Sequence, residues 1–406
     1  MMFTTYEPTS RSRQFLKFKG ELYMIRSTRF AITALAVLGV TALAGCAQPD
    51  VTDVATGGDG DKPTFRFAVV AEETGNFAGY GTQLVAGVKA AVKDINAAGE
   101  YNFTMEPVIY DCQSDQAICV QKTRQAITSD ELPVVIGPIV SVDIIPSAEV
   151  TNRAGVPHLV MAVLPAITAD YDNTFRWGTQ NDRSNQTVID YVEGNLKTGE
   201  DVAIVNATTD FGKGGAAIQT EQLAEIGVTP ALTIGHDPDQ ADYTPVITQL
   251  KELNPRYVLL SDSNPADVAK LLRQSKELGL ESEWIGADAS GSIDLAGDAA
   301  IGYMTVSPWY PTEEANSASL AEKLQAQGIE IPGWIAAMAY DATIGLAEAV
   351  ATGGTTSEEI WSGLEGLSEF DGLARDGWDF SKDHMGLTSS TIAVWNGAGY
   401  ESVWPN

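Results

Sequence analysis

Residues 64–96 read TFRFAVVAEETGNFAGYGTQLVAGVKAAVKDIN, and this stretch decides the fold class. Its first seven residues are largely apolar and β-branched or aromatic, which predicts a buried strand. A loop containing three glycines follows. After the loop, apolar residues recur at intervals of three and four, which predicts a helix. These residues are Val85, Val88, Val92 and Ile95. A strand followed by a helix is the opening of a βαβ unit.

The same alternation of strand and helix recurs along most of the chain. Further strands are expected at 103–110, 132–137, 156–161, 201–206, 231–234, 256–260 and 284–286. Strands separated by helices of ten to fifteen residues favour right-handed βαβ units and parallel sheets covered on both faces. Because the alternation restarts after Asn181, the sequence predicts an α/β protein with two doubly wound parallel-sheet lobes.

The C-terminal region departs from this alternation. The sequence of residues 334–350 predicts a long helix. The sequence of residues 390–404 predicts two strands joined through Asn396 and Gly397. Asn-Gly between two apolar runs is typical of a β-hairpin. We therefore expect an antiparallel pair that adds edge strands to one lobe.

The N-terminal region has the pattern of a lipoprotein signal. Residues 24–46 read MIRSTRFAITALAVLGVTALAGC, a basic start, an apolar run shorter than a membrane span, and small residues before Cys46. We expect Met24 to be the true start and residues 1–45 to be a non-functional extension plus the signal peptide. Cys46 would be lipidated and 46–63 would be a flexible acidic tether. An ordinary secretory signal is the alternative.

These features place the mature chain outside the cytoplasm, anchored by lipid to the outer face of the cytoplasmic membrane. A formal net charge of −29 argues against nucleic acid and anionic lipid as partners. In an oxidising compartment, Cys112 and Cys119 are expected to form a disulfide. A metal site is the rival interpretation, but the three histidines are scattered and no CxxC or HxxxH spacing occurs.

Enzyme motifs are missing from the sequence. There is no GxSxG elbow, no GxxxxGK[ST] phosphate loop and no GxGxxG after a strand. We therefore expect no catalytic residues and no cofactor, and we expect a protein that binds its partner without changing it. Parallel sheets place ligands at the carboxyl ends of their strands, so Ser141 and Asp288, which follow predicted strands, are candidate ligand contacts. Helix capping by Ser141 and a solvated loop position for Asp288 are the alternatives.

Several segments together resemble the leucine/isoleucine/valine-binding proteins, the type I periplasmic solute-binding subunits of ABC importers. They are FAVVA (67–71), NFAGYG (76–81), GVKAAVKDIN (87–96), VIGP (135–138) with Ser141, NATTDFGKG (206–214), LLRQSKELG (271–279) and the ending from Phe370 to Phe380. The resemblance spans the whole mature domain. It implies two lobes joined by three crossing segments, near 177–181, 307–310 and 373–378. The N-terminal lobe would comprise 64–178 and 310–375, and the C-terminal lobe 179–309 and 376–406.

The resemblance also implies a set of ligand-binding residues. Ser141 corresponds to a serine that binds the ligand carboxylate, and Tyr80 to an aromatic wall of the first lobe. Phe211 matches an aromatic residue of the second lobe, and Asp288 an acid that holds the ammonium group. Trp334, or its neighbour Ile335, would complete an apolar floor.

Two places depart from the family pattern. Relatives commonly read Ser-Pro-Ser-Ala-Thr where this chain has residues 160–164, so Leu164 carries an alkyl chain in place of a hydroxyl that would bind a polar head group, and the backbone N–H groups of Val163 and Leu164 remain. Asn264 stands where some relatives have an aromatic residue and makes that wall more polar. Each lost hydrogen bond to a charged group costs roughly 1.5 to 3 kcal/mol. The sequence therefore leaves the identity of the ligand open among several small solutes.

The expected function is capture of a small molecule and its delivery to ABC permease subunits, by a protein that acts as a monomer. A branched-chain or other neutral amino acid is the first candidate ligand. Amides, urea-like compounds and aromatic acids are the alternatives. A ligand-sensing receptor domain is the alternative of a different class, because it has the same fold.

Overall fold

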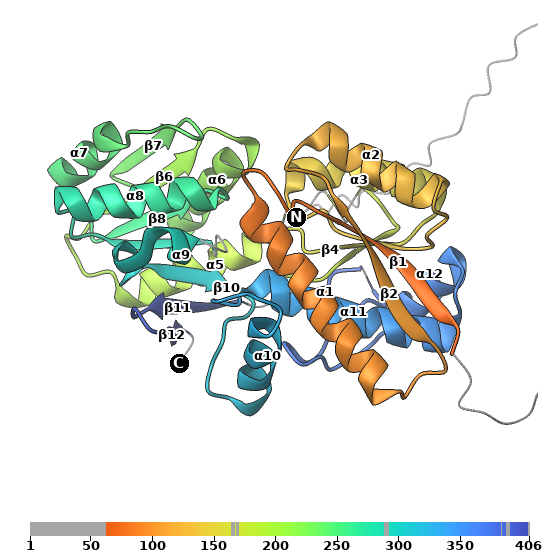
Figure 1. Ribbon diagram of the computed structural model, residues 1–406. Coiled ribbons are helices and arrows are strands. Elements are labelled where there is room, and N and C mark those ends of the chain that lie inside the picture. Colours follow the sequence, from red (N-terminus) through yellow and green to blue (C-terminus); the bar gives the residue numbers. More distant parts are fainter. Residues whose placement is uncertain are drawn as a thin grey trace, which may run out of the picture. The chain divides into compact units, whose positions relative to one another are not determined.

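The computed structural model describes residues 62–163, 167, 170–287, 292–382, 384–386 and 390–404 (Figure 1). The signal, the tether and the expected lipidation at Cys46 lie outside these residues. All the described residues belong to one unit by their contacts. Within it the strands form a five-stranded and a seven-stranded sheet, as the alternation of strands and helices predicts.

The first sheet is entirely parallel, in the order β2-β1-β3-β4-β5. Its strands are β1 (Thr64–Ala71), β2 (Thr104–Asp111), β3 (Val135–Ile136), β4 (His158–Val160) and β5 (Thr174–Arg176). The associated helices are α1 (Ala78–Ala98), α2 (Gln116–Thr128), α3 (Ser141–Ala154), α10 (Ala315–Gln325), α11 (Trp334–Gly353) and α12 (Ser357–Glu365).

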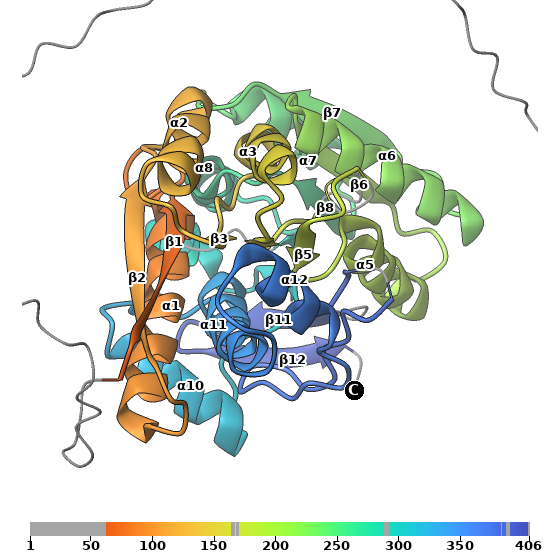
Figure 2. The same cartoon turned by 90° about the vertical axis from the view of Figure 1, so that its right-hand side faces the viewer.

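Alternate residues of β1 show how this sheet is covered. Val69 packs into the apolar cluster of α1 and α11, whereas Val70 packs into the cluster of α2. Figures 1 and 2 show α1 with α11 on one side of the sheet and α2 with α3 on the other. Both faces of the strand are therefore buried, which explains its unbroken apolar run.

The second sheet has the order β12-β11-β10-β9-β8-β6-β7. Its strands are β6 (Val202–Ala207), β7 (Leu232–His236), β8 (Tyr257–Ser261), β9 (Glu283–Ala287), β10 (Met304–Ser307), β11 (Thr391–Trp395) and β12 (Tyr400–Trp404). The helices are α5 (Asn181–Asn195), α6 (Asp210–Glu225), α7 (Thr244–Leu253), α8 (Pro265–Leu278) and α9 (Ser292–Ala296), followed by the short 3₁₀ turn η1 (Gly297–Ala300).

The expected C-terminal hairpin is confirmed. β11 pairs antiparallel with β10 and with β12, so the tail adds the edge strands of the second sheet. The connecting turn is held by Asn396, whose side-chain oxygen accepts the N–H groups of Ala398 and Gly399 at 2.9 Å each. An asparagine that bonds its own downstream backbone in this way is a common turn device.

The first loop is shorter than the sequence suggests, because α1 begins at Ala78 and includes Gly81. A Cβ atom on Gly81 would lie 2.2 Å from the backbone carbonyl of Glu72. Glycine is therefore needed there so that the start of α1 can approach the end of β1 closely. This contact brings the first turn of α1 next to the carboxyl end of the sheet.

The third crossing lies later than expected. Trp378 and Phe380 belong to the apolar cluster of the first sheet, with ring centroids 4.7 and 4.6 Å from that of Trp177. Met385 also forms a β-bridge with Arg176. The boundary expected at residue 376 is therefore wrong. We propose that the first lobe extends to residue 386 and that the chain returns to the second sheet before β11.

A buried aspartate organises this returning segment. Asp341, on α11, accepts the backbone N–H groups of Leu373, Ala374 and Arg375 and the indole N–H of Trp378 at 2.8 to 3.1 Å. Burial raises the pKa of Asp341 to about 6 despite these four donors, which act to lower it. One side chain thus fixes the backbone between α12 and the second sheet.

The predicted disulfide joins Cys112, after β2, to Cys119 in α2. Both cysteines are fully buried. Because they are bonded to each other, they offer no thiolate to a metal ion, and the rival metal-site interpretation fails for this pair. Among the described helices, none is long and apolar enough to cross a membrane.

Candidate functional site

A cavity of about 190 Å³ lies where the carboxyl ends of strands from both sheets meet. Parallel sheets expose the loops after their strands at this end, which is the usual place for a ligand. The first sheet and its helices contribute Phe77, Tyr80, Ile139, Val140, Ser141, Val142, Met161, Val163, Trp334 and Ile335. The second sheet contributes Thr209, Phe211, Asp262, Ser263 and Ala287.

Aromatic side chains form much of the wall. Phe77 and Tyr80, at the start of α1, are stacked with ring centroids 6.2 Å apart and planes 6° from parallel. Phe211 lies in the first turn of α6, and Trp334 is the first residue of α11. Helix starts thus bring aromatic rings from three separate segments to one cavity.

One hydrogen bond connects the two sides of the cavity directly. The Tyr80 hydroxyl donates to the backbone carbonyl of Ser263 at 2.5 Å. Tyr80 belongs to a helix of the first sheet, whereas Ser263 follows β8 of the second. The bond therefore ties the two lobes together at the rim of the cavity.

Ser141 is the first residue of α3, and Val140 occupies the N-cap position without a side-chain cap. The N-cap alternative considered for Ser141 is therefore wrong, and the side chain lines the cavity instead. The start of α3 is positioned by Gly137, whose φ of +77° is favourable only for glycine.

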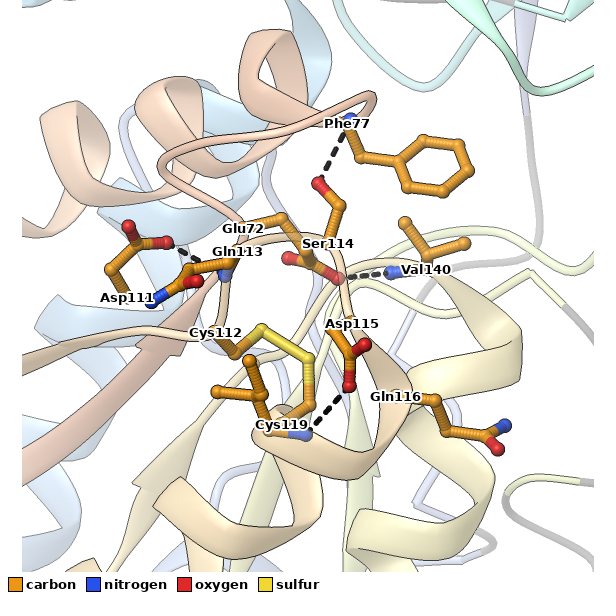
Figure 3. Close-up of a disulfide and its surroundings, with 12 residues drawn as sticks. Glu72, Phe77, Asp111, Cys112, Gln113, Ser114, Asp115, Gln116, Cys119 and Val140 are labelled. Carbon is orange, nitrogen blue, oxygen red and sulfur yellow. Dashed lines mark hydrogen bonds between the residues drawn. A yellow bond between two sulfur atoms is a disulfide. The ribbon is translucent and has the colours of Figure 1, made fainter. Parts of the chain in front are cut away.

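A pair of buried carboxyl groups lies directly behind Ser141. Glu72, after β1, accepts the backbone N–H groups of Ile139 and Val140 at 3.1 to 3.2 Å. The negative charge of Asp143, in the first turn of α3, also acts on Glu72. Figure 3 shows the Glu72 carboxyl group between the disulfide and the N–H group of Val140.

Both carboxyl groups of this pair have raised pKa values. Burial is the main cause for Glu72, and the neighbouring charge of Asp143 adds to it. Burial is again the main cause for Asp143, and the charge of Asp115 raises its pKa further. Because two carboxylates in contact repel each other, the pair retains a proton that an isolated carboxyl group would lose.

A second ionisable pair lies on the opposite side of the cavity. Asp262, after β8, is 3 % exposed, and its Oδ2 atom lies 3.2 Å from Nε2 of His236 at the end of β7. Burial acts to lower the pKa of His236, but the contact with Asp262 outweighs it and the net pKa is raised. Burial also raises the pKa of Asp262. The pair therefore holds its shared proton strongly.

Five of the residues expected at the site line the cavity together. They are Tyr80, Ser141, Val163, Phe211 and Trp334. Two others, Leu164 and Asp288, lie outside the described residues.

Asn264 is not among the lining residues. Its side-chain oxygen accepts the N–H group of Ala266 at 3.0 Å, and its nitrogen donates to Asp239 and Asp267 at 3.1 Å each. It caps the start of α8 and holds the loop after β7. The expected ligand contact at Asn264 is therefore wrong, because its polar atoms serve the local structure.

The sequence interpretation missed Phe77, Asp262 and Glu72. Asp262 and Glu72 each follow a strand that was predicted correctly, so the rule that ligands meet strand carboxyl ends could have found both. Phe77 precedes α1 and is close in sequence to Tyr80, which was expected at the site.

Comparisons with known proteins agree with this architecture. The family model described as periplasmic binding protein matches residues 64–400. The Leucine-, isoleucine-, valine-, threonine-, and alanine-binding protein of Pseudomonas aeruginosa is 25% identical over 304 residues, which cover 73% of this chain and 80% of that protein. Leu/Ile/Val-binding protein homolog 1 of Brucella abortus is 28% identical over 306 residues, which cover 73% of this chain and 81% of that protein.

Solved structures share the fold. The substrate-binding protein LivJ of Streptococcus pneumoniae, in complex with isoleucine, superposes with a TM-score of 0.76 at 23% identity, covering 84% of this chain and 100% of LivJ. A solute-binding protein of Rhodopseudomonas palustris in complex with 3,4-dihydroxybenzoic acid superposes with a TM-score of 0.74 at 19% identity, covering 84% of this chain and 96% of that protein. The match over residues 64–400 shows that this chain belongs to the periplasmic binding protein family.

Proposed function

We propose that this protein captures a small solute with a compact apolar body in the cavity between its two sheets and delivers it to an ABC importer. The observation that carries the proposal is the aromatic-walled cavity itself. It is built from helix starts and strand ends of both sheets, and Tyr80 bonds to Ser263 across it. A solute that touches both sides would stabilise the closed arrangement.

The size and lining of the cavity favour a small aliphatic body. Its volume of about 190 Å³ is somewhat larger than a buried cavity of ~150 Å³ that accommodates benzene. Side chains such as Met161, Val163 and Ile335 surround it. The relatives named for binding leucine, isoleucine and valine support a body of this kind. Branched-chain and other neutral amino acids are therefore the first solutes to test.

We further propose that the protein binds its solute without chemistry. The described lining residues include the hydroxyl groups of Ser141, Thr209 and Ser263 but no histidine that could act as a base beside them. The relatives are named as binding proteins, which supports the same conclusion.

The family name indicates an extracytoplasmic location, where the solute is captured before transport. We propose lipid attachment at Cys46, with permease subunits as partners and a monomeric binding protein. A ligand-sensing receptor domain would share the fold. Solute uptake by cells that carry or lack the gene distinguishes the two, because only a transport protein is required for accumulation of the solute.

A thermal-shift screen tests the capture of a solute. We expect at least one branched-chain compound to raise the melting temperature, since a ligand at 100 times its dissociation constant adds about 2.7 kcal/mol of stability. Amides, urea-like compounds and aromatic acids form the rest of the panel. If no compound with a compact apolar body raises the melting temperature at millimolar concentration, the proposal is wrong.

A further inference from the structure

A short loop next to the cavity is closed by the disulfide between Cys112 and Cys119 (Figure 3). The loop leads from the end of β2 into the first turn of α2, and we call residues 112–119 the disulfide loop. None of its residues is among the described residues that line the cavity. Its polar side chains nevertheless form hydrogen bonds to the backbone of residues that do line it. The disulfide loop can therefore act on the site without touching a solute.

Ser114 connects the disulfide loop to the aromatic wall of the cavity. Its hydroxyl oxygen accepts the backbone N–H group of Phe77 at 3.0 Å, and the hydroxyl donates to the backbone carbonyl of Thr74 at 2.8 Å (Figure 3). Phe77 is the N-cap residue of α1. In a capping box, the N–H group of the N-cap residue is bound by the side chain three positions later in the same helix. That position in α1 is Tyr80, whose hydroxyl donates to Ser263 instead, so Ser114 supplies the acceptor from another segment.

The backbone of the disulfide loop is held in an unusual conformation that presents the Ser114 hydroxyl to α1. Gln113 and Ser114 have φ values of +60° and +56°, in the left-handed region that residues other than glycine rarely adopt. Such a conformation persists only where the surroundings enforce it. Here the disulfide closes the loop, and Oδ1 of Asp111 accepts the N–H group of Gln113 at 2.8 Å. A Cβ atom on Gly75 would lie 2.6 Å from the carbonyl oxygen of Gln113, so the two loops are in direct contact.

The disulfide loop also contacts the start of α3. Nε2 of Gln116 donates to the backbone carbonyl of Val142 at 2.6 Å. Val142 lines the cavity and follows Ser141, the first residue of α3. One loop therefore bonds both to the segment that carries Phe77 and to the segment that carries Ser141.

We propose that the disulfide loop is a positioning element of the solute site, in which Ser114 is a positioning residue that holds the Phe77 ring in the cavity wall. This inference rests on the proposed function, because the place of the Phe77 ring affects binding only if a solute occupies this cavity. A wall residue that is fixed before the solute arrives lowers the conformational entropy lost on binding. Ser114 thereby contributes to affinity although it does not line the cavity.

A double-mutant cycle on the full mature protein tests this role. Calorimetric titrations with the best solute of the thermal-shift screen compare the wild type, Ser114→Ala, Phe77→Ala and the double variant. We expect Ser114→Ala to weaken binding about two- to tenfold, and Phe77→Ala to weaken it at least about tenfold because an aromatic ring leaves the wall. In the Phe77→Ala background, Ser114→Ala should change the affinity less than about twofold, since no ring remains to be positioned.

Ser357→Ala is the matched control. The Ser357 hydroxyl donates to the backbone carbonyl of Pro133 at 2.8 Å in the same lobe, at the opposite end of the first sheet, so this variant should bind like the wild type. Should Ser114→Ala not fold, Ser114→Gly takes its place in the cycle, because glycine adopts a φ of +56° without strain.

The outcomes separate the inference from the proposed function. Unchanged affinity in Ser114→Ala overturns the inference and leaves the proposed function intact. Equal losses from Ser114→Ala with and without the Phe77 ring overturn it as well, because they indicate a general structural role. The same holds for an equal loss in Ser357→Ala. If the wild type binds no compound of the panel, the proposed function fails and the inference fails with it.

Discussion

Replacing Glu72 by glutamine should stabilise the protein at high pH and leave its stability nearly unchanged at low pH. The amide oxygen of the introduced glutamine can accept the N–H groups of Ile139 and Val140, as the Glu72 carboxyl does now. The substitution therefore keeps the hydrogen bonds while removing a buried charge.

The magnitude follows from the pKa of Glu72, which burial, with a smaller contribution from Asp143, raises from the ordinary 4.5 to about 7. A raised carboxyl pKa means that the folded state binds more protons than the unfolded state between these two values. Stability is therefore lost as the pH rises through this window. A tenfold change in an acid dissociation constant corresponds to about 1.4 kcal/mol, so the wild type should lose about 3 kcal/mol by pH 8 through Glu72 alone.

Urea unfolding followed by tryptophan fluorescence at pH 5 and pH 8 measures this difference. We expect Glu72→Gln to differ from the wild type by less than about 1 kcal/mol at pH 5 and to exceed it by about 2 to 3 kcal/mol at pH 8. The pH 5 measurement is the internal control for altered packing. A variant that is destabilised equally at both pH values would refute the view that Glu72 is a buried, proton-holding carboxyl group.

Tyr80→Phe should weaken solute binding about two- to tenfold in calorimetry, since it removes the hydroxyl that donates to Ser263, while Tyr101→Phe, far from the cavity, should have no effect. Equal affinities of Tyr80→Phe and the wild type would show that the contact does not contribute to closure. Asp341→Ala leaves four N–H donors without their acceptor and should reduce the free energy of unfolding by at least about 3 kcal/mol, measured by urea unfolding; a loss below about 1 kcal/mol would contradict that role. Cys46→Ser should move the protein from the membrane fraction to the soluble fraction without changing its melting temperature, and retention in the membrane fraction would rule out the proposed anchor.

The sequence allowed much of the fold to be predicted because local signals were sufficient for it. Alternating strands and helices indicate parallel sheets, and Asn396 with Gly397 indicates the hairpin at the edge. Site residues such as Ser141 and Phe211 could also be predicted, because each lies within a few residues of a strand end or a helix start.

Features that depend on distant contacts could not be predicted in the same way. Trp378 packs on Trp177, which lies 201 positions earlier in the chain, so the boundary at residue 376 was placed too early. Asn264 was expected to face a solute, but the loop after β7 brings Asp239 to its amide nitrogen. The position of Glu72 directly after a strand could be predicted from the sequence. Its hydrogen bonds to Ile139 and Val140 before α3 could not, because they form only when the strands are assembled into the sheet.

Filling the cavity is the most direct test of the central claim. Ala287, at the end of β9, lines the cavity, and Ala287→Phe would place a phenyl ring into a space of about 190 Å³. Leu295→Phe, at a side chain that is 54 % exposed in the same lobe, is the matched control. In calorimetric titrations with the best solute of the thermal-shift screen, we expect the control to bind like the wild type and Ala287→Phe, folded by its circular dichroism, to show no binding. Unchanged affinity in Ala287→Phe would contradict capture of the solute in this cavity.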